Sequence, residues 1–117
     1  MKTYTGYREH TAAGGIAGVG VRVHEAGPVP RPLDPRLDLR NHSPTGVEWG
    51  YAGSGPAQLA LALAADVLGD DARAMAVYQA LKLRLVGRFP ADGWTLTEDA
   101  LLATIRSLET ERGVARG

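Results

Sequence analysis

The residues of this sequence best suited to chemistry gather in residues 41–56, with Arg40 just before them as a counter-charge. This segment is rich in glycine, holds two large aromatic residues, and runs directly into an expected helix. The first turn of a helix carries N–H groups without intrahelical partners and about half a unit of positive charge. Because glycines allow close approach to such a turn, the segment predicts a site for a small anion. The candidate ligand-binding residues are Arg40, Asn41, His42, Trp49, Tyr51, Gly53, Ser54 and Gly55.

Two interpretations of the segment compete. In the binding interpretation, Gly53, Ser54 and Gly55 present N–H groups to an anion, and Trp49 or Tyr51 stacks on the rest of the ligand. In the architectural interpretation, the glycines make a turn and the aromatic residues fill a gap between a sheet and the helices, while Ser54 caps the helix. The exposure of the two aromatic side chains is the observation that separates these interpretations.

Three known signatures do not match the segment. A P-loop requires Gly-Lys-Ser or Gly-Lys-Thr, where this chain has Gly-Pro-Ala at residues 55–57. The dinucleotide fingerprint requires a third small residue where Gln58 stands. A nucleophile elbow requires glycine two residues to either side of Ser54, where alanine and proline stand. The segment therefore predicts binding without assigning it to one of these classes.

His42 is the residue of the segment suited to acid–base catalysis near neutral pH. Asp38 and Ser43 lie near it in the sequence, and Glu48 follows at a longer spacing. Residues so close on an extended chain seldom converge, so an enzyme using His42 with Asp38 or Glu48 ranks behind binding, and no catalytic residue is assigned. The three histidines are scattered, without a carboxylate at ligand spacing, which predicts no metal site and no cofactor.

Residues 1–40 are expected to form a small antiparallel sheet. In residues 19–23 valine alternates with glycine and arginine, which is the period of a strand with one buried face. Residues 4–8 supply a partner strand, and alternating leucines in residues 37–39 predict a short third strand. The prolines in and around residues 29–36 favour an edge strand or a polyproline-like passage there, because proline cannot donate a ladder hydrogen bond.

Residues 56–112 predict three helices, of which the first is the clearest. It begins at Pro56, which suits a first helical turn, and Gly69 supplies a left-handed stop. Nearly every residue between them is apolar, and a helix apolar on all sides is buried on several sides. We expect this helix at the centre of the core, and its large apolar surface also raises the prospect of a homodimer.

The second and third helices have amphipathic patterns. The second is expected to run from a cap at Asp70 or Asp71 to about Arg88. The third is expected to start at Thr97, although Thr95 fits a capping box two residues earlier. The prediction is one α+β domain: a sheet of two or three strands in residues 1–40, the glycine and aromatic loop at 41–55, three helices in 56–112, and a frayed tail at 113–117.

The length, charge and cysteine count of the chain exclude or disfavour several classes of function. A chain of 117 residues can bury one modest core, and thirteen basic residues balance thirteen acidic ones, which disfavours binding to nucleic acid or an anionic membrane. Cysteine is absent, which excludes disulfides and thiolate chemistry. The first residues lack signal-peptide character and no apolar run is long enough to cross a bilayer, so the sequence predicts a cytoplasmic protein.

Several blocks of sequence between Leu37 and Thr97 carry a family resemblance. They are Leu37 to Gly46, Glu48 to Tyr51, Gly53 to Ala60, Gly69 to Asp71, Tyr78-Gln79 and Trp94 to Thr97. In these blocks the chain resembles the domain of unknown function 6166 family, short proteins found in bacteria, haloarchaea and some mobile elements. It departs from the commoner pattern at Val47, where phenylalanine is usual, and at Ala52, where glycine is usual. The resemblance implies no activity, but its central block overlaps the segment that the chemistry selects.

Two functions of different classes follow. The leading hypothesis is a non-catalytic domain that binds a small anionic ligand, a nucleotide or a phosphorylated metabolite, at the loop before the first helix. The second is a protein-interaction or inhibitor module that modulates host proteins, which Trp49 and Tyr51 on a flat exposed patch would favour.

Overall fold

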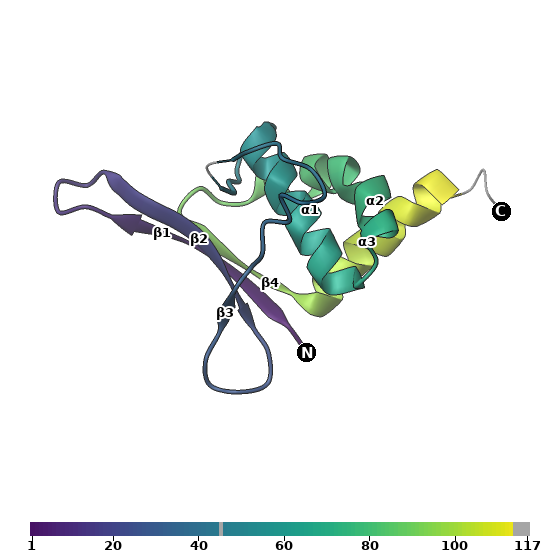
Figure 1. Ribbon diagram of the computed structural model, residues 1–117, viewed down its shortest axis with the longest axis horizontal. Coiled ribbons are helices and arrows are strands. Elements are labelled where there is room, and N and C mark those ends of the chain that lie inside the picture. The colour runs from purple at the N-terminus through teal and green to yellow at the C-terminus, as the bar shows by residue number, and fades with distance from the viewer. Residues whose placement is uncertain (45, 114–117) are drawn as a thin grey trace.

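The computed structural model describes residues 1–44 and 46–113, with side chains as far as Glu111. The fold is α+β, as the sequence predicts (Figure 1). Its strands are β1 (Thr3–His10), β2 (Ile16–His24), β3 (Arg31–Pro32) and β4 (Gly93–Thr97), and its helices are α1 (Ser54–Leu68), α2 (Asp71–Arg84) and α3 (Glu98–Gly113), with a short 3-10 helix at Val86–Arg88. The sheet is antiparallel in the order β3-β2-β1-β4. The helices lie together to one side of it, and the β1–β2 hairpin reaches beyond them (Figure 1).

The alternation predicted for β2 sets the buried face of the sheet. Val21 and Val23 are buried, and they pair with Gly6 and Tyr4 of β1. Because successive strand residues point to opposite faces, Arg8 belongs to the same inner face as Gly6. Its guanidinium is accordingly almost buried, which brings a positive charge beneath the loop that precedes α1.

The strand predicted at residues 37–39 is not formed. Residues 37–39 form a turn, in which Leu39 N–H donates to Arg36 O at 3.0 Å. Arg36 has a positive φ of 55°, and its guanidinium binds Asp38 and Asp71, so this segment is held by side chains and has no strand partner. The third strand is instead β3, inside the proline-containing passage, and it lies at the sheet edge as proline requires.

The strand β4 is absent from the sequence prediction, which assigned only the cap of the third helix in this segment, at Thr97 or Thr95. Its residues alternate, with Trp94 and Leu96 buried and Thr95 exposed, and it pairs with β1. Thr97 is nevertheless the helix cap, since its Oγ1 accepts from Ala100 N–H at 3.2 Å. The sheet therefore has four strands, one of which comes from the C-terminal half of the chain.

The helix α1 is central, as predicted, and starts two residues earlier than Pro56. Gly53 is its N-cap residue, and Gly69 ends it with a left-handed φ of 62°. Residues 57–65 are all buried within one copy of the chain, so the apolar character of α1 requires no second copy. A homodimer remains a prediction. None of the helices in the described part of the chain is long and apolar enough to span a membrane.

The helix α2 begins as predicted and ends early. The side chain of its N-cap residue Asp70 accepts from Arg73 N–H at 3.1 Å. The helix ends at Arg84, and the short 3-10 helix replaces the predicted last turn. The backbone at Gly87 packs closely against residues 51 and 82, where a side chain would not fit comfortably. The expected frayed tail at 113–117 falls, apart from Gly113 at the end of α3, outside the described residues.

A partly buried carboxylate, Asp66, ties the C-terminal end of α1 to the sheet. It accepts from Tyr4 Oη at 2.7 Å, from Arg31 at 2.9 Å and from Lys2 Nζ at 3.3 Å. Burial alone would raise the pKa of Asp66, but the hydrogen bonds from Tyr4 and Arg31, with the charges of Lys2 and Arg31, hold that pKa below its ordinary value. Burial and the bond to Asp66 raise the pKa of Tyr4. All three partners precede Asp66 by 35 residues or more in the sequence.

Candidate functional site

The loop before α1 is anchored at its start by His42. The backbone N–H of His42 donates to Gln58 Oε1 at 2.8 Å, and Gln58 Nε2 donates to Pro35 O at 2.6 Å. The ring Nε2 of His42 lies 2.6 Å from Tyr78 Oη. The fully buried Gln58 thus joins the turn, the loop and α1, and His42 contributes to this anchoring.

The indole of Trp49 lies in the core. It is 2 % exposed, and it contacts Trp94 edge to face with ring centroids 5.7 Å apart. Its Nε1 donates to Ala91 O at 3.2 Å, and the Arg8 guanidinium lies 4.3 Å from its ring centroid. Stacking on a ligand therefore falls to Tyr51 alone, which is 52 % exposed. Both aromatic residues line an open hollow of about 440 Å³ beside the loop, but the buried indole contributes little surface to it.

An ion pair that the sequence analysis missed lies beneath the loop. The Arg8 guanidinium donates to both oxygens of Glu48 at 2.9 Å, and Glu48 Oε1 also accepts from Trp49 N–H at 3.1 Å. Hydrogen bonds from Arg8, opposed by partial burial, lower the pKa of Glu48, and the same contact raises the pKa of Arg8. The strand period around Gly6 places Arg8 on the inner face, and this was the available signal.

The glycines at the start of α1 make room for two side chains. A Cβ added at Gly53 would lie 2.5 Å from Tyr51 Cε2, so the ring of Tyr51 occupies that space. A Cβ added at Gly55 would lie 2.6 Å from Glu48 Cβ and 3.2 Å from Tyr51 Oη. Packing therefore favours glycine most strongly at Gly55, where the neighbour is Glu48 Cβ, whereas at Gly53 the half-exposed Tyr51 ring would have to move.

The N–H groups of Ser54 and Gly55 remain open. The first hydrogen bond of the helix runs from Ala57 N–H to Gly53 O at 3.0 Å, and Pro56 has no N–H. Among the described residues, no acceptor is bound to the N–H groups of Ser54 and Gly55, and no side chain caps the helix. The anticipated cap by Ser54 is not formed, because Gly53 holds the N-cap position.

A pocket of about 360 Å³ lies in front of these N–H groups. Ser43 lines it and is only 9 % exposed, and its hydroxyl has no hydrogen-bond partner in the described part of the chain. We call this hollow the α1 pocket. Its lining residues are Val19, Ser43, Gly46, Val47, Glu48, Tyr51, Ser54 and Gly55.

Besides His42 and Trp49, two more of the candidate binding residues do not line the α1 pocket. Arg40 is exposed and its guanidinium donates to the neighbouring Leu39 O at 2.9 Å, so it does not face the open N–H groups as a counter-charge. Asn41 is also exposed and does not line the pocket. Of the eight candidates, the structure brings together Tyr51, Ser54 and Gly55, with Gly53 at the N-cap.

The side chains considered for catalysis, all among the described residues, do not hydrogen-bond to one another. Glu48 is bound to Arg8 and Asp38 is bound to Arg36, whereas His42 contacts Tyr78. No hydrogen bond joins His42 to either carboxylate among the described residues. A search of the same residues finds no group of three or more histidines and carboxylates placed to hold a metal ion.

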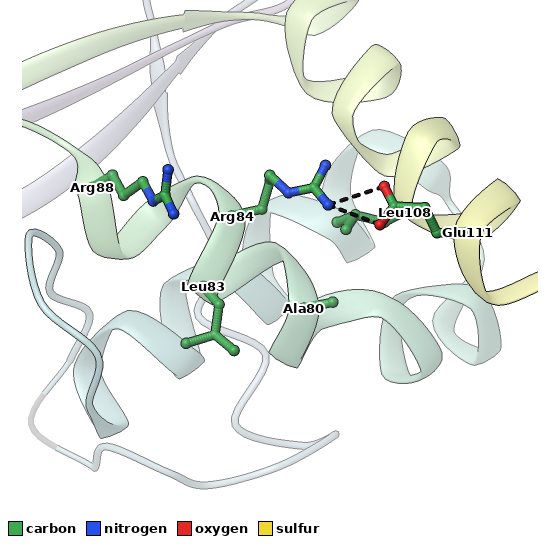
Figure 2. Close-up of a pocket in the computed structure, with 6 residues that line it drawn as sticks. All are labelled: Ala80, Leu83, Arg84, Arg88, Leu108 and Glu111. Carbon is green, nitrogen blue, oxygen red and sulfur yellow. Dashed lines mark hydrogen bonds and ion pairs between the residues drawn. The ribbon is translucent and has the colours of Figure 1, made fainter.

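A second hollow, of about 290 Å³, lies between α2 and α3. Figure 2 shows Arg84 and Glu111 facing each other across it, joined by hydrogen bonds of 2.9 Å. Leu83 and Arg88 line the same hollow, and Leu83 is 59 % exposed. This hollow is more apolar than the α1 pocket and carries no open helix terminus.

Comparison with known proteins gives the family and no function. No curated protein matches the chain, and no solved structure does. A family model described as a family of unknown function, DUF6166, matches residues 4–107 and so spans β1 to the greater part of α3. The chain belongs to this family of unknown function.

Proposed function

We propose that this protein is a small non-catalytic binding domain, and that the α1 pocket takes a small anionic ligand such as a nucleotide or a phosphorylated metabolite. The observation that carries the proposal is the pair of open N–H groups on Ser54 and Gly55, with the free hydroxyl of Ser43 beside them. Buried polar groups are normally paired, and helix N-termini bind phosphate readily because their dipole and N–H groups favour negative charge.

The dimensions of the α1 pocket suit this class of ligand. Its volume of about 360 Å³ lies within the range of small-molecule sites, about 300 to 1,000 Å³. Tyr51 offers an exposed ring at the rim, which can stack on a planar or sugar-like part of the ligand. The positive charge of the first helical turn takes the place of the counter-charge that Arg40 does not supply.

Two substitutions at one position test the proposal. Ser54 is the first helical residue, where proline is well tolerated, so Ser54→Pro removes a single N–H while the helix is retained. Ser54→Ala removes the hydroxyl and keeps the N–H. Isothermal titration with AMP, glucose 6-phosphate and inorganic phosphate should show binding that Ser54→Pro weakens about tenfold and Ser54→Ala leaves nearly unchanged. Absence of heat with every compound would reject the proposal.

A protein-interaction module is the second candidate, and the exposed Leu83 in the hollow between α2 and α3 favours it. A leucine flanked by Arg84 and Arg88 suits an acidic partner with an apolar anchor. Affinity capture from a bacterial lysate tests it with Leu83→Asp as the disrupting bait. Ala76→Asp, at an exposed position of the same helix, is the control. Identical captured proteins from the wild type and both variants would remove this candidate.

A further inference from the structure

The carboxylate of Glu48 keeps one acceptor position open at the wall of the α1 pocket. A carboxylate has about four lone-pair positions. Glu48 Oε1 accepts from Arg8 at 2.9 Å and from Trp49 N–H at 3.1 Å, and Oε2 accepts from Arg8 at 2.9 Å. The remaining position is on Oε2, and the side chain is 31 % exposed. Since Arg8 keeps the carboxylate ionised, this position can only accept a hydrogen bond.

The Glu48 side chain lines the same pocket as the open donors. A side chain at Gly55 would meet both Glu48 Cβ and Tyr51 Oη, so these two side chains and the Gly55 backbone surround one point. None of the contacts of Glu48 in the described structure is with the N–H groups of Ser54 or Gly55, so the carboxylate does not occupy the helix terminus itself. The α1 pocket therefore has a donor side, formed by Ser43 and the first helical turn, and an acceptor side formed by Glu48.

A simple anion would bind the donor groups of the α1 pocket and leave the acceptor position of Glu48 unfilled. It would fill the donor side while lying near the negative charge of Glu48, and the Arg8 guanidinium is already engaged by that carboxylate. A ligand that carries hydroxyl groups beside its anionic group avoids this conflict, because a hydroxyl donates to the carboxylate. Ser43, which is buried and unpaired, is an independent sign that the donor side awaits a ligand oxygen.

We infer that the ligand is a hydroxylated phosphate ester, meaning a sugar phosphate or the ribose phosphate part of a nucleotide. This inference rests on the proposed function. The phosphate oxygens accept from Ser54 N–H, Gly55 N–H and Ser43 Oγ, while a hydroxyl of the sugar donates to Glu48 Oε2. The sugar ring lies against Tyr51, whose ring covers Gly53 at the entrance to the helix.

A matched pair of ligands tests the inference on the unaltered protein. Propyl phosphate and glycerol 3-phosphate have the same three-carbon chain and phosphate, and only the second carries hydroxyls. Titration calorimetry should give glycerol 3-phosphate about tenfold tighter binding, as expected for one hydrogen bond to a charged group. Ribose 5-phosphate should bind at least as tightly. Equal affinities for the propyl and glycerol esters would overturn the inference while leaving the binding domain in place, and binding of neither, nor of ribose 5-phosphate, would overturn both.

The variant Glu48→Gln tests whether Glu48 is the group that distinguishes the two ligands. Glu48→Gln should reduce the preference for glycerol 3-phosphate over propyl phosphate at least threefold, while the affinity for propyl phosphate is retained or rises because a negative charge near the phosphate is removed. Glu111→Gln, which alters a carboxylate paired with Arg84 far along α3, should leave the preference unchanged. Circular dichroism verifies that each variant is folded. If Glu48→Gln folds and keeps the full preference for glycerol 3-phosphate, Glu48 is not the group that recognises the hydroxyl. If this variant does not fold, the comparison of the two ligands on the unaltered protein decides whether the hydroxyl is recognised.

Discussion

The two ends of α1 differ in how completely their polar groups are paired. At the C-terminal end, the carboxylate of Asp66 accepts from three side chains that come from the N-terminal part of the protein. At the N-terminal end, the N–H groups of Ser54 and Gly55 and the hydroxyl of Ser43 have no partner among the described residues. Because a partly buried carboxylate needs hydrogen-bond partners, stability explains the first arrangement, whereas the open groups of the second contribute no hydrogen bond to the fold. This contrast on a single helix separates architecture from a candidate site.

The largest expected effect belongs to the paired end. Replacing Asp66 by alanine should lower the free energy of unfolding by about 3 kcal/mol, because Lys2 and Arg31 would be left partly buried without their shared carboxylate. Urea denaturation followed by circular dichroism measures the loss. Glu25→Ala removes a more exposed partner of the same Arg31, and its effect on stability should be much smaller because solvent screens exposed ion pairs. Similar losses in the two variants would show that Asp66 is an ordinary surface charge.

At the N-terminal end of α1, side chains pack tightly around Gly55 although the N–H groups of the first turn are free. Gly55→Ala should cost about 2 kcal/mol, because its Cβ would lie 2.6 Å from Glu48 Cβ, and the Glu48 side chain would have to move. Gly18→Ala is the control, since its Cβ would meet only Glu9 Oε2 at 3.9 Å. Thermal unfolding of both variants measures the difference. A fully stable Gly55→Ala protein would mean that the position of Glu48 against the helix is not fixed.

The sequence predicted local features at the C-terminal end of α1 and missed the long-range contacts at both ends. Gly69 as a helix stop and Asp70 as a cap are local signals, and both are confirmed. The pairing of Arg8 with Glu48 spans 40 residues, and the pattern around either residue names no partner. No strand was predicted at residues 93–97, because the short alternation there runs directly into the helix cap at Thr97.

The burial of Trp49 shows why a site is harder to predict than a fold. A glycine-rich segment with a tryptophan is compatible with an exposed indole that stacks on a ligand and with an indole buried in the core. The residue types are the same in both cases. What decided the outcome is the inner face of β1, where Arg8 lies over the indole, together with Ala91, which accepts its N–H. Both lie about 40 residues away in the sequence.

Acid should weaken the paired end of α1. The pKa of Asp66 is lower in the folded protein than in the unfolded chain, where it has its ordinary value. The contribution of Asp66 is therefore fully present above the ordinary aspartate pKa and is lost as the pH falls through that value toward the folded pKa. Urea denaturation from neutral to acidic pH should show a smaller loss of stability in Asp66→Asn than in the wild type. Parallel profiles would contradict the assignment of this loss to Asp66.

The smallest effect comes from a matched pair of hydroxyl deletions, one at each end of α1. Tyr4→Phe removes a hydroxyl that donates to Asp66 at 2.7 Å, and it should cost about 1.5 kcal/mol because a hydrogen bond to a charged group is lost. Ser43→Ala removes a hydroxyl with no partner among the described residues, so its effect on stability should stay within about 0.5 kcal/mol. Urea denaturation measures both. If Ser43→Ala cost as much as Tyr4→Phe, the Ser43 hydroxyl would already be bound inside the protein, and the two ends of the helix would no longer differ in the way that a ligand site requires.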